Sequence, residues 1–305
     1  MFKKVMTTVV AAAVTGSLLA GCGGGDPTSS DTGSSGDSST LTIGSADFSE
    51  SQLLATIYSH ALRDAGINVT EKLGIGSREI YLEALKDGSI DMLPEYSGTY
   101  LSALDPDTTE TDPAKITAEL KEKVGDGLEI LDVSEAENKD VVTLSSDFAR
   151  EHPEVDKVSD LQGLAGDMTL AGPSEWKERY MGVAGLKEVY GLDFKSFKVL
   201  DAGGPLTLAS LKSGQAQAGD MFSSDPAIED NDLKPLEDDK NLFLPAQIVP
   251  VVRSSKITDQ GREVINKVQA ALTTEGLTDM NRKIADGGDL GQIADEWLKA
   301  EGLAS

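Results

Sequence analysis

The stretch ALKDGSIDMLPEYSGTY, Ala84 to Tyr100, decides the fold, because SLKSGQAQAGDMFSSD, Ser210 to Asp225, repeats it at one constant offset. In each copy Leu-Lys is followed by a glycine, and further on by an aromatic residue and a serine. The pattern predicts a helix that ends at the glycine, then a strand, then a loop that carries the aromatic side chain. The same order also occurs in unrelated α/β proteins, so periodicity alone leaves a chance match open.

The position of the two aromatic residues suggests a binding site. Ligands of open α/β sheets bind beyond the carboxyl ends of the strands. If the two units face each other, Tyr96 of the first copy and Phe222 of the second lie on opposite walls of one cleft. The repeat therefore predicts a site between two similar halves.

The rest of residues 41–305 alternates short apolar runs with amphipathic ones, which is typical of an α/β fold. Strands are predicted at LTIGSADF, INVTEKL, SIDMLPEY, MTLAGP, FKVLD and AQAGDMF. Helices are predicted after an N-cap at Ser49, in SREIYLEALKDG, in SEWKERYMGVAGLKEVYG, in LTLASLKSG and throughout residues 258–302. Trp297 shares the apolar face of that last region, so we expect it in the core.

The first residues predict secretion. Lys3 and Lys4 precede an apolar run, and LAGC follows it, with Cys22 as the single cysteine of the chain. The pattern is that of a signal peptide over residues 1–21, too short for a stable membrane span. LAGC resembles the bacterial lipobox, whose cysteine is lipid-modified, and an ordinary signal peptide with a chance cysteine is the alternative. The small polar residues 22–40 then predict a flexible, lipidated tether.

Charge and composition exclude several classes of function. The formal net charge is −25, from 52 acidic and 27 basic residues, so we expect no binding to nucleic acid. With one cysteine and two histidines, the chain lacks the raw material for a zinc site or for Cys/His catalysis. GIGSRE has Glu79 in place of the third glycine of a dinucleotide-binding loop. We therefore expect no cofactor, no metal and no enzymatic activity.

A family resemblance covers nearly all of residues 41–305. It is carried by IGSADFSES, ALKDGSIDMLPEYSGTYL, GPSEWKERYMGVAGLKEVYG, LKSGQAQAGDMFSSDPAI and LEDDKNLFLPAQIVPVVR, with PEYSGT as the most specific motif. These stretches resemble the extracytoplasmic substrate-binding proteins of osmoprotectant ABC transporters. Proteins of that family bind glycine betaine, choline, carnitine and related quaternary amines.

The resemblance implies the bilobed type II periplasmic-binding-protein fold. Two α/β lobes then close on a ligand about a hinge that the chain crosses twice. We expect these crossings near Asn138 and Asp220. Lobe 1 would consist of residues 41–138 and 220–305, and lobe 2 of residues 139–219.

The resemblance also implies aromatic residues around the ligand. Tyr96 and Thr99 match ligand-contacting positions in the first lobe, and Phe222 matches an aromatic residue of the cage around the cation. Aromatic faces suit a quaternary ammonium because that group has no N–H to donate. Each desolvated ring contributes about 0.5–2 kcal/mol to such binding.

Charged candidates complete the implied site. Arg179 matches the arginine that holds the ligand's carboxylate, and the planar fork of a guanidinium suits this role. A surface ion pair between Arg179 and Glu175 or Glu178 is the alternative. Asp47, in the GSADF turn, is a further candidate for ligand contact.

The sequence departs from the family pattern at several of these positions. Ala46 stands where family members often carry a lysine, and tyrosines expected near Asp140 and Leu206 are missing. Asp140 could pair with a cation or could be a solvated loop charge, and the sequence favours neither. Trp176 or Tyr100 could supply a replacement ring.

We therefore predict a lipid-anchored, monomeric solute-binding protein at the extracytoplasmic face of the membrane. It would deliver a quaternary amine or a zwitterion to the transmembrane permease subunit of an ABC importer. One alternative keeps the fold and replaces the ligand by an amino acid or another zwitterion that bears N–H groups, to which Asp140 would be suited. Another is a small-molecule enzyme, such as a deaminase or a transferase, on a similar bilobed scaffold.

Overall fold

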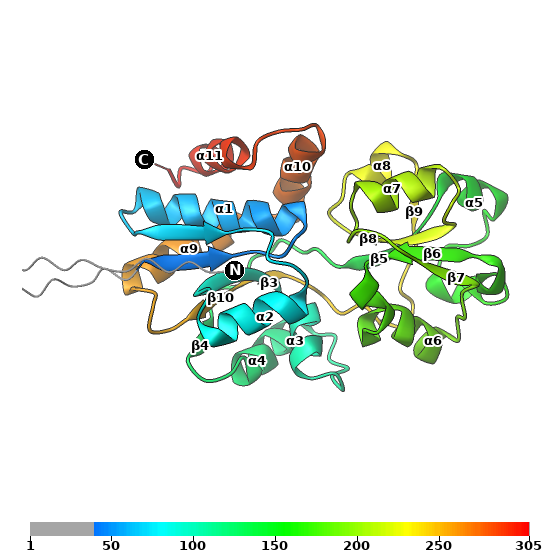
Figure 1. Cartoon of the computed structure of the whole chain (residues 1–305), viewed down its shortest axis with the longest axis horizontal. Coiled ribbons are helices and arrows are strands. Elements are labelled where there is room, and N and C mark those ends of the chain that lie inside the picture. Colours follow the sequence, from blue (N-terminus) through cyan, green and yellow to red (C-terminus); the bar gives the residue numbers. More distant parts are fainter. Residues whose placement is uncertain (1–39, 305) are drawn as a thin grey trace, which may run out of the picture. The chain divides into compact units, whose positions relative to one another are not determined.

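The repeated stretches form the same unit twice in the computed structural model, which describes residues 40–304 (Figure 1). Helix α2 is followed by strand β3 in the first copy, and α7 by β8 in the second, with the bounds α2 Arg78–Asp87, β3 Met92–Tyr96, α7 Pro205–Lys212 and β8 Ala218–Phe222. Gly88 and Gly214 follow the two helices with φ of 81° and 71°. Left-handed backbone favours glycine, so both predicted helix ends are confirmed. The predicted signal peptide, Cys22 and nearly all of the predicted tether lie outside the described residues.

Each unit belongs to a separate five-stranded sheet. The sheet of lobe 1 has the order β2-β1-β3-β10-β4, with β1 Leu41–Gly44, β2 Val69–Lys72, β4 Leu128–Ile130 and β10 Ile248–Arg253. The sheet of lobe 2 has the order β7-β6-β8-β5-β9, with β5 Asp140–Leu144, β6 Thr169–Gly172, β7 Ser196–Val199 and β9 Lys234–Pro235. The predicted bilobed α/β fold is confirmed.

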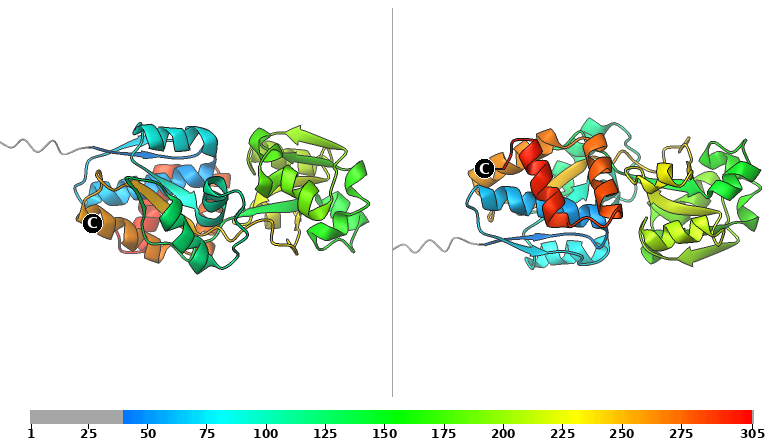
Figure 2. Two further views of the ribbon diagram at one scale, coloured as in Figure 1. Left: turned by 90° about the horizontal axis from the view of Figure 1, so that it is seen from below. Right: turned by 90° about the horizontal axis from the view of Figure 1, so that it is seen from above.

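The crossings between the lobes follow from the strand directions. In lobe 1, β1 runs parallel to β2 and β3, whereas β10 is antiparallel to β3. Lobe 2 repeats this arrangement, with β6 parallel to β7 and β8 and β5 antiparallel to β8. The antiparallel strand of each lobe arrives directly from the other lobe. The chain therefore crosses once before β5 and returns once before β10 (Figure 2).

The prediction of a return crossing near Asp220 is wrong. Asp220 lies within β8, which pairs with β5 in the middle of the lobe 2 sheet. The chain returns only after β9, through residues 242–247, which we call the return crossing. It runs beside the first crossing, since Asn138 donates its backbone N–H to Ala246 O at 3.0 Å. Lobe 2 thus spans residues 140–241, and lobe 1 takes the rest of the described chain.

Helices cover both sheets. Besides α2, lobe 1 has α1 Ser49–Asp64, α3 Ser97–Leu104, α4 Pro113–Lys123, α9 Asp259–Ala271, α10 Thr274–Ala285 and α11 Leu290–Ala300. Besides α7, lobe 2 has the short helices α5 Ser146–Glu151, α6 Gly185–Tyr190 and α8 Ala227–Asp230, together with the 3-10 turns η1 Val158–Leu161, η2 Ala165–Asp167 and η3 Ser174–Lys177. The C-terminal region is thus three helices rather than one continuous helical stretch. None of the helices among residues 40–304 is long and apolar enough to cross a membrane.

Three local predictions need correction. Phe48, not Ser49, is the N-cap of α1, and no side chain caps that end. β3 leads directly into α3 at Ser97, so Tyr96 is the last residue of a strand rather than part of a loop. The stretch SEWKERYMGVAGLKEVYG is not one helix, because the segment η4 Tyr180–Ala184 has non-helical backbone at Met181 and Gly182. A side chain at Gly182 would collide with Trp176 O, at 2.1 Å from an added Cβ.

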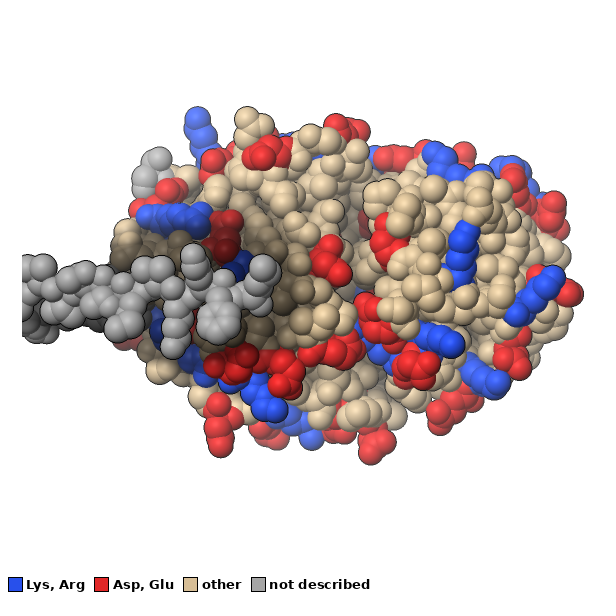
Figure 3. Space-filling view, viewed as in Figure 1, with Lys and Arg blue, Asp and Glu red and all other residues tan. Residues whose placement is uncertain are grey.

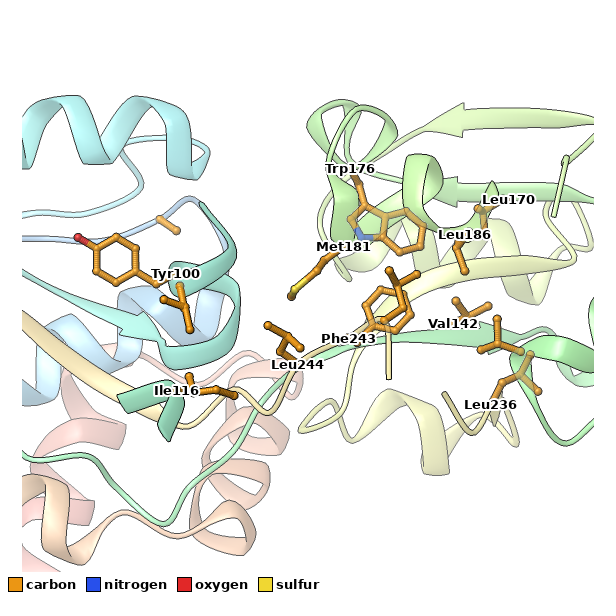
Figure 4. Close-up of a cluster of buried hydrophobic side chains, with 14 of the residues drawn as sticks. Tyr100, Ile116, Val142, Leu170, Trp176, Met181, Leu186, Leu236, Phe243 and Leu244 are labelled. Atoms are coloured by element: carbon orange, nitrogen blue, oxygen red, sulfur yellow. The ribbon is translucent and has the colours of Figure 1, made fainter. Parts of the chain in front are cut away.

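Two large groups of buried side chains hold the lobes. One packs α1, α9 and α11 of lobe 1 together and includes Trp297, whose predicted place in the core is confirmed. The other continues from lobe 1 into lobe 2 along the return crossing. Figure 4 shows Leu244 between Tyr100 of lobe 1 and Phe243, which lies under Trp176 of lobe 2. The return crossing is therefore an apolar element that belongs to both cores.

Candidate ligand site between the lobes

A cavity of about 60 Å³ lies where the ends of β3 and β8 approach each other. Its lobe 1 wall is formed by the GSADF turn after β1, the start of α2 and the end of β3, and its lobe 2 wall by β5, η3 and β8. A single water needs about 10–15 Å³ on a comparable scale, so the cavity has room for a small molecule of a few heavy atoms.

Aromatic rings form a row along this cavity. Phe48, from the GSADF turn, lies between Tyr96 and Phe222, with ring centroids 5.9 Å from the first and 5.0 Å from the second. All three line the cavity. Tyr96 is 6% exposed, and burial together with the neighbouring Glu50 carboxylate raises the pKa of its hydroxyl well above the usual range. The ring is therefore a neutral, fixed surface.

Glu50 fixes the row from behind. Its buried carboxylate accepts hydrogen bonds from Tyr96 Oη at 2.7 Å, Asn138 Nδ2 at 2.8 Å, Ser224 Oγ at 2.5 Å and Asn281 Nδ2 at 2.6 Å. These donors come from the end of β3, the first crossing, the turn after β8 and α10. One carboxylate thus ties an aromatic residue of the cavity to the point where the chain changes lobes.

A second buried carboxylate, Glu95, organises the wall at the start of α2. Arg78 donates to both of its oxygens, at 2.9 and 3.0 Å, and Tyr81 Oη donates at 2.7 Å. Burial alone would lower the pKa of Arg78, but Glu95 raises it well above the usual range. Thr99 accepts from Arg78 at 3.2 Å and donates to Tyr96 O at 3.1 Å. The arginine is therefore a permanent cation at the cavity.

Arg179 does not pair with Glu175 or Glu178. It donates to both carboxylate oxygens of Glu79, from Nε at 3.1 Å and from Nη2 at 3.0 Å. Glu79 belongs to α2 of lobe 1, so this ion pair joins the two lobes at the edge of the cavity. Both side chains remain partly exposed, at 28% for Arg179 and 57% for Glu79. The guanidinium predicted to hold a carboxylate thus holds one of the chain's own.

The lobe 2 wall carries two carboxylates. Asp140 is on β5 and partly buried, which contradicts a solvated loop charge, and Asp220 is on β8 and 1% exposed. Burial raises the pKa of Asp140, although Arg179 and Arg78 oppose the shift. Burial and then the charge of Asp140 raise the pKa of Asp220 well above the usual range. Asp220 Oδ1 has no hydrogen-bond partner among the described residues.

Every predicted ligand residue of the described chain lines this one cavity, namely Asp47, Tyr96, Thr99, Asp140, Trp176, Arg179 and Phe222. Asp47 is exposed at the rim. Of the two suggested replacement rings, Trp176 lines the cavity, whereas Tyr100 is buried in the core. Leu206, near a missing tyrosine, is 60% exposed and lies away from the cavity.

The sequence interpretation missed Phe48, Arg78, Tyr81 and Asp220, which line the same cavity. Phe48 had a usable signal, since it follows Asp47 in a turn just beyond a predicted strand. Asp220 lies where the sequence predicts a crossing between the lobes rather than a ligand contact. Arg78 had no local signal, because its partner Glu95 lies on another element.

Acidic groups dominate the surroundings of the cavity. Figure 3 shows acidic and basic side chains interspersed over one face, with several acidic ones along the boundary between the lobes. Four acidic residues line the cavity, namely Asp47, Asp140, Glu175 and Asp220. The basic residues that line it are Lys139 and two arginines, each of which is already paired with a glutamate. This balance favours a ligand with positive charge.

The family model and the relatives that match this chain describe binding proteins, of glycine betaine or carnitine. Residues 39–300 match the family model described as the substrate binding domain of ABC-type glycine betaine transport system. A glycine-betaine-binding protein of Pseudomonas aeruginosa is 29% identical over 226 residues, which cover 70% of this chain and 71% of that protein. A carnitine transport binding protein of Listeria monocytogenes is 27% identical over 255 residues, covering 81% and 82%.

Among solved structures, a glycine betaine/carnitine/choline ABC transporter protein has a TM-score of 0.68 at 24% identity. The match covers 86% of this chain and 99% of that one, and it supports the fold. The family model spans nearly all of the described residues and both lobes that form the cavity. The chain belongs to the substrate-binding domains of ABC-type glycine betaine transport systems, the extracytoplasmic components that bind solute for an importer.

Proposed function

We propose that this protein captures glycine betaine, choline or a related quaternary amine in the cavity between its lobes. It then delivers the ligand to the transmembrane permease subunit of an ABC importer. We further propose that it acts as a monomer anchored to the membrane by a lipid on Cys22.

The row formed by Phe48, Tyr96 and Phe222 is the observation that carries this proposal. A quaternary ammonium cannot donate a hydrogen bond from nitrogen, so a protein binds it through aromatic faces and a negative environment. The cavity offers both, because the rings lie next to carboxylates whose charge the arginines do not fully balance. Relatives named for glycine betaine and for carnitine support the same class of ligand.

A ligand that also bears a carboxylate would use Arg179. Its guanidinium is already held with its fork toward an acidic group, Glu79, at the cavity edge. The ligand's carboxylate would take the place of Glu79, and the cation would lie against the rings. No bond is made or broken in the ligand in this mechanism, since the family is a binding component of a transporter. Ligand recovered unchanged after prolonged incubation would distinguish this mechanism from the enzyme alternative.

Substitution of Phe48 tests the proposal, because this residue is the centre of the row. Phe48→Leu keeps an apolar side chain but removes the ring, and should weaken choline binding about five- to thirtyfold by calorimetry. Phe48→Tyr keeps the ring and should bind within a few-fold of wild type. Choline should also bind more tightly than 3,3-dimethylbutanol, its uncharged carbon analogue. If the neutral analogue binds equally well, or if Phe48→Leu has no effect, the rings do not recognise a cation.

The anchor is tested separately at Cys22. Because the modified cysteine is the only one in the chain, Cys22→Ser should move the protein from the membrane fraction to the soluble extracytoplasmic fraction. Its affinity for ligand should not change, since residues 40–304 contain the whole cavity. Continued association of the Cys22→Ser protein with membranes would contradict lipid anchoring.

A further inference from the structure

The lobe 2 wall presents two carboxylates on one face of its sheet. In the antiparallel register of β5 and β8, Asp140 is opposite Phe222 and Val142 is opposite Asp220. Opposite residues point to the same face, so both carboxylates lie on the face that carries Phe222. Their positions are diagonal neighbours, and the two carboxyl groups are close enough for the charge of Asp140 to raise the pKa of Asp220. A ring for the cation and two acceptors are therefore adjacent on one wall.

Two buried polar atoms on this wall, Asp220 Oδ1 and Trp176 Nε1, make no hydrogen bond of normal geometry within the described chain. The indole N–H still lies close enough to the Asp140 carboxyl to oppose the rise in its pKa. Asp220 and Trp176 are each 1% exposed and line the cavity. The carboxylate oxygen is an acceptor and the indole N–H a donor. Figure 4 shows Trp176 with the nitrogen-bearing side of its indole toward lobe 1, and Phe243 stacks beneath it at 6.2 Å between ring centroids. Buried polar groups nearly always have partners, so a pair left open in a cavity indicates a ligand.

Neither arginine of the cavity is free to pair with Asp220. Arg78 is bound to Glu95, and Arg179 is bound to Glu79 in the other lobe. The remaining charged neighbour that acts on Asp220 from its own lobe is Glu175, which is also acidic. Close packing holds Asp220 in position, because a Cβ added at Gly172 would lie 3.2 Å from both the Asp220 Cβ and the Trp176 ring.

We propose that Asp220 and Trp176, with Asp140, form a subsite that binds a hydroxyl group of the quaternary amine. The hydroxyl donates its hydrogen to Asp220 Oδ1 and accepts the indole N–H of Trp176, so one group satisfies both open atoms. The ligand class is thus a hydroxyl-bearing quaternary amine such as choline or carnitine, in preference to glycine betaine. This inference rests on the proposed function and adds which group the ligand carries besides its quaternary ammonium.

The electrostatics of the pair agree with this geometry. Burial and the proximity of Asp140 raise the pKa of Asp220, so the two carboxyl groups resist carrying two charges in the empty cavity. Arg179 and Arg78 favour the ionised form of Asp140, and Glu175 opposes ionisation of Asp220. A cation at Phe222 would favour ionisation of both. A ligand carboxylate placed beside Asp140 and Asp220, rather than at Arg179, would be repelled.

The test compares choline with its O-methyl ether, which keeps the quaternary ammonium and the ether oxygen but has no hydrogen to donate. In calorimetry with the full chain, choline should bind about ten- to hundredfold more tightly, since the ether leaves a buried carboxylate oxygen unpaired. Asp220→Asn is nearly the same size and should reduce this preference to a few-fold. Glu175→Gln is the charge control. It removes an acidic group of the same cavity that also opposes ionisation of Asp220, but it leaves Asp220 Oδ1 in place, so the preference for choline should persist.

The outcomes separate the two proposals. Equal binding of choline and its ether by wild type would overturn the hydroxyl subsite and leave the quaternary-amine function standing. A preference for choline that survives in Asp220→Asn would show that another residue reads the hydroxyl. Failure of wild type to bind either cation would overturn both proposals. Trp176→Phe retains an aromatic ring without the N–H donor. It should weaken choline and the ether alike, because each has an oxygen that can accept the indole N–H, provided that thermal unfolding shows an intact fold.

Discussion

The arginines on the two walls of the cavity are both held by carboxylates of lobe 1. Arg78 meets Glu95, which is fully buried, whereas Arg179 meets Glu79, which is 57% exposed. A buried, bidentate pair is costly to break, but a solvent-exposed pair contributes only about 0–1 kcal/mol. We therefore propose that a ligand carboxylate displaces Glu79 from Arg179, whereas Arg78 remains paired with Glu95 and shapes the wall.

This difference predicts the effect of removing the competing carboxylate. Glu79→Gln should strengthen the binding of a carboxylate ligand such as glycine betaine by a few-fold, because it frees Arg179 at little cost. It should leave choline, which has no carboxylate, within twofold. Arg179→Ala should weaken glycine betaine and spare choline. Calorimetry of both ligands with both variants gives a crossed pattern, and equal losses in Arg179→Ala would assign that residue a structural role.

Asp225 gives a second prediction at the scale of one side chain. Burial raises its pKa to about 6, although the N–H of Ala227, which donates to Asp225 Oδ1 at 2.8 Å, acts in the opposite direction. The folded protein therefore holds this proton more tightly than the unfolded chain, whose aspartates titrate near pH 3.9. The stability that this group adds is complete below about pH 4 and is lost as the pH rises to about 6.

Asp225→Asn cannot ionise but keeps the acceptor for Ala227. Its free energy of unfolding relative to wild type should therefore increase between pH 4 and pH 7, by at most about 3 kcal/mol for a shift of two pKa units. Urea unfolding at the two pH values measures this difference. A difference that does not vary with pH would show that the Asp225 carboxyl titrates normally in the folded protein.

At the scale of elements, the PEYSGT motif joins β3 to α3 against the return crossing. Glu95 and Tyr96 face the cavity networks, and Ser97 accepts the N–H of Gln247 at 3.0 Å. Gly98 lies directly against the crossing, where an added Cβ would be 2.3 Å from Pro245 O and 2.7 Å from the Cβ of Leu244. The motif is therefore a packing surface for the hinge as well as a wall of the cavity.

Gly98→Ala should accordingly destabilise the protein by about 1–3 kcal/mol, because backbone must move to make room for the methyl group. Gly166→Ala is the matched control, since a Cβ there meets no atom within 4 Å. Guanidinium unfolding of the two variants measures the difference. Equal unfolding midpoints would mean that the return crossing can move to accept the methyl group without loss of stability. That result would argue against a tightly packed hinge element.

At the scale of the two lobes, the crossings are the only covalent links between the sheets of the described chain. The first crossing is tied to Glu50 through Asn138, and Glu50 also holds Tyr96 of the ring row. Across the cavity edge the lobes meet in the Arg179–Glu79 pair. A rotation about the crossings would therefore change the cavity wall and this ion pair together, while each sheet remains intact.

Ligand binding should shift the lobes toward a more closed arrangement, because a ligand that contacts both walls stabilises the conformations in which they are near. Small-angle scattering should show a smaller radius of gyration with saturating choline than without ligand. The same samples must show binding by calorimetry. An unchanged radius with binding confirmed would argue against capture by closure.

Much of this architecture was accessible from the sequence by itself. The alternation of apolar and amphipathic runs, the glycines that end α2 and α7, and the aromatic residue at the end of each following strand are local patterns, and local backbone preferences are sufficient to set them. The family resemblance pointed to candidate ligand residues from Asp47 to Phe222, and the structure brings them together in one cavity. Composition argues against a zinc or Cys/His site, because the chain has one cysteine and two histidines.

Only the tertiary structure decided which distant groups meet. Arg179 takes Glu79, 100 residues away, rather than its neighbours in sequence, and β8 remains in lobe 2 because it pairs with β5. Phe48 bridges the two predicted rings, and Asp220 is left with an open acceptor beside Trp176. Such pairings depend on how two sheets are brought together, and no periodicity along the chain encodes them. The sequence determined the elements and the class of site, whereas packing between the lobes determined the partners within it.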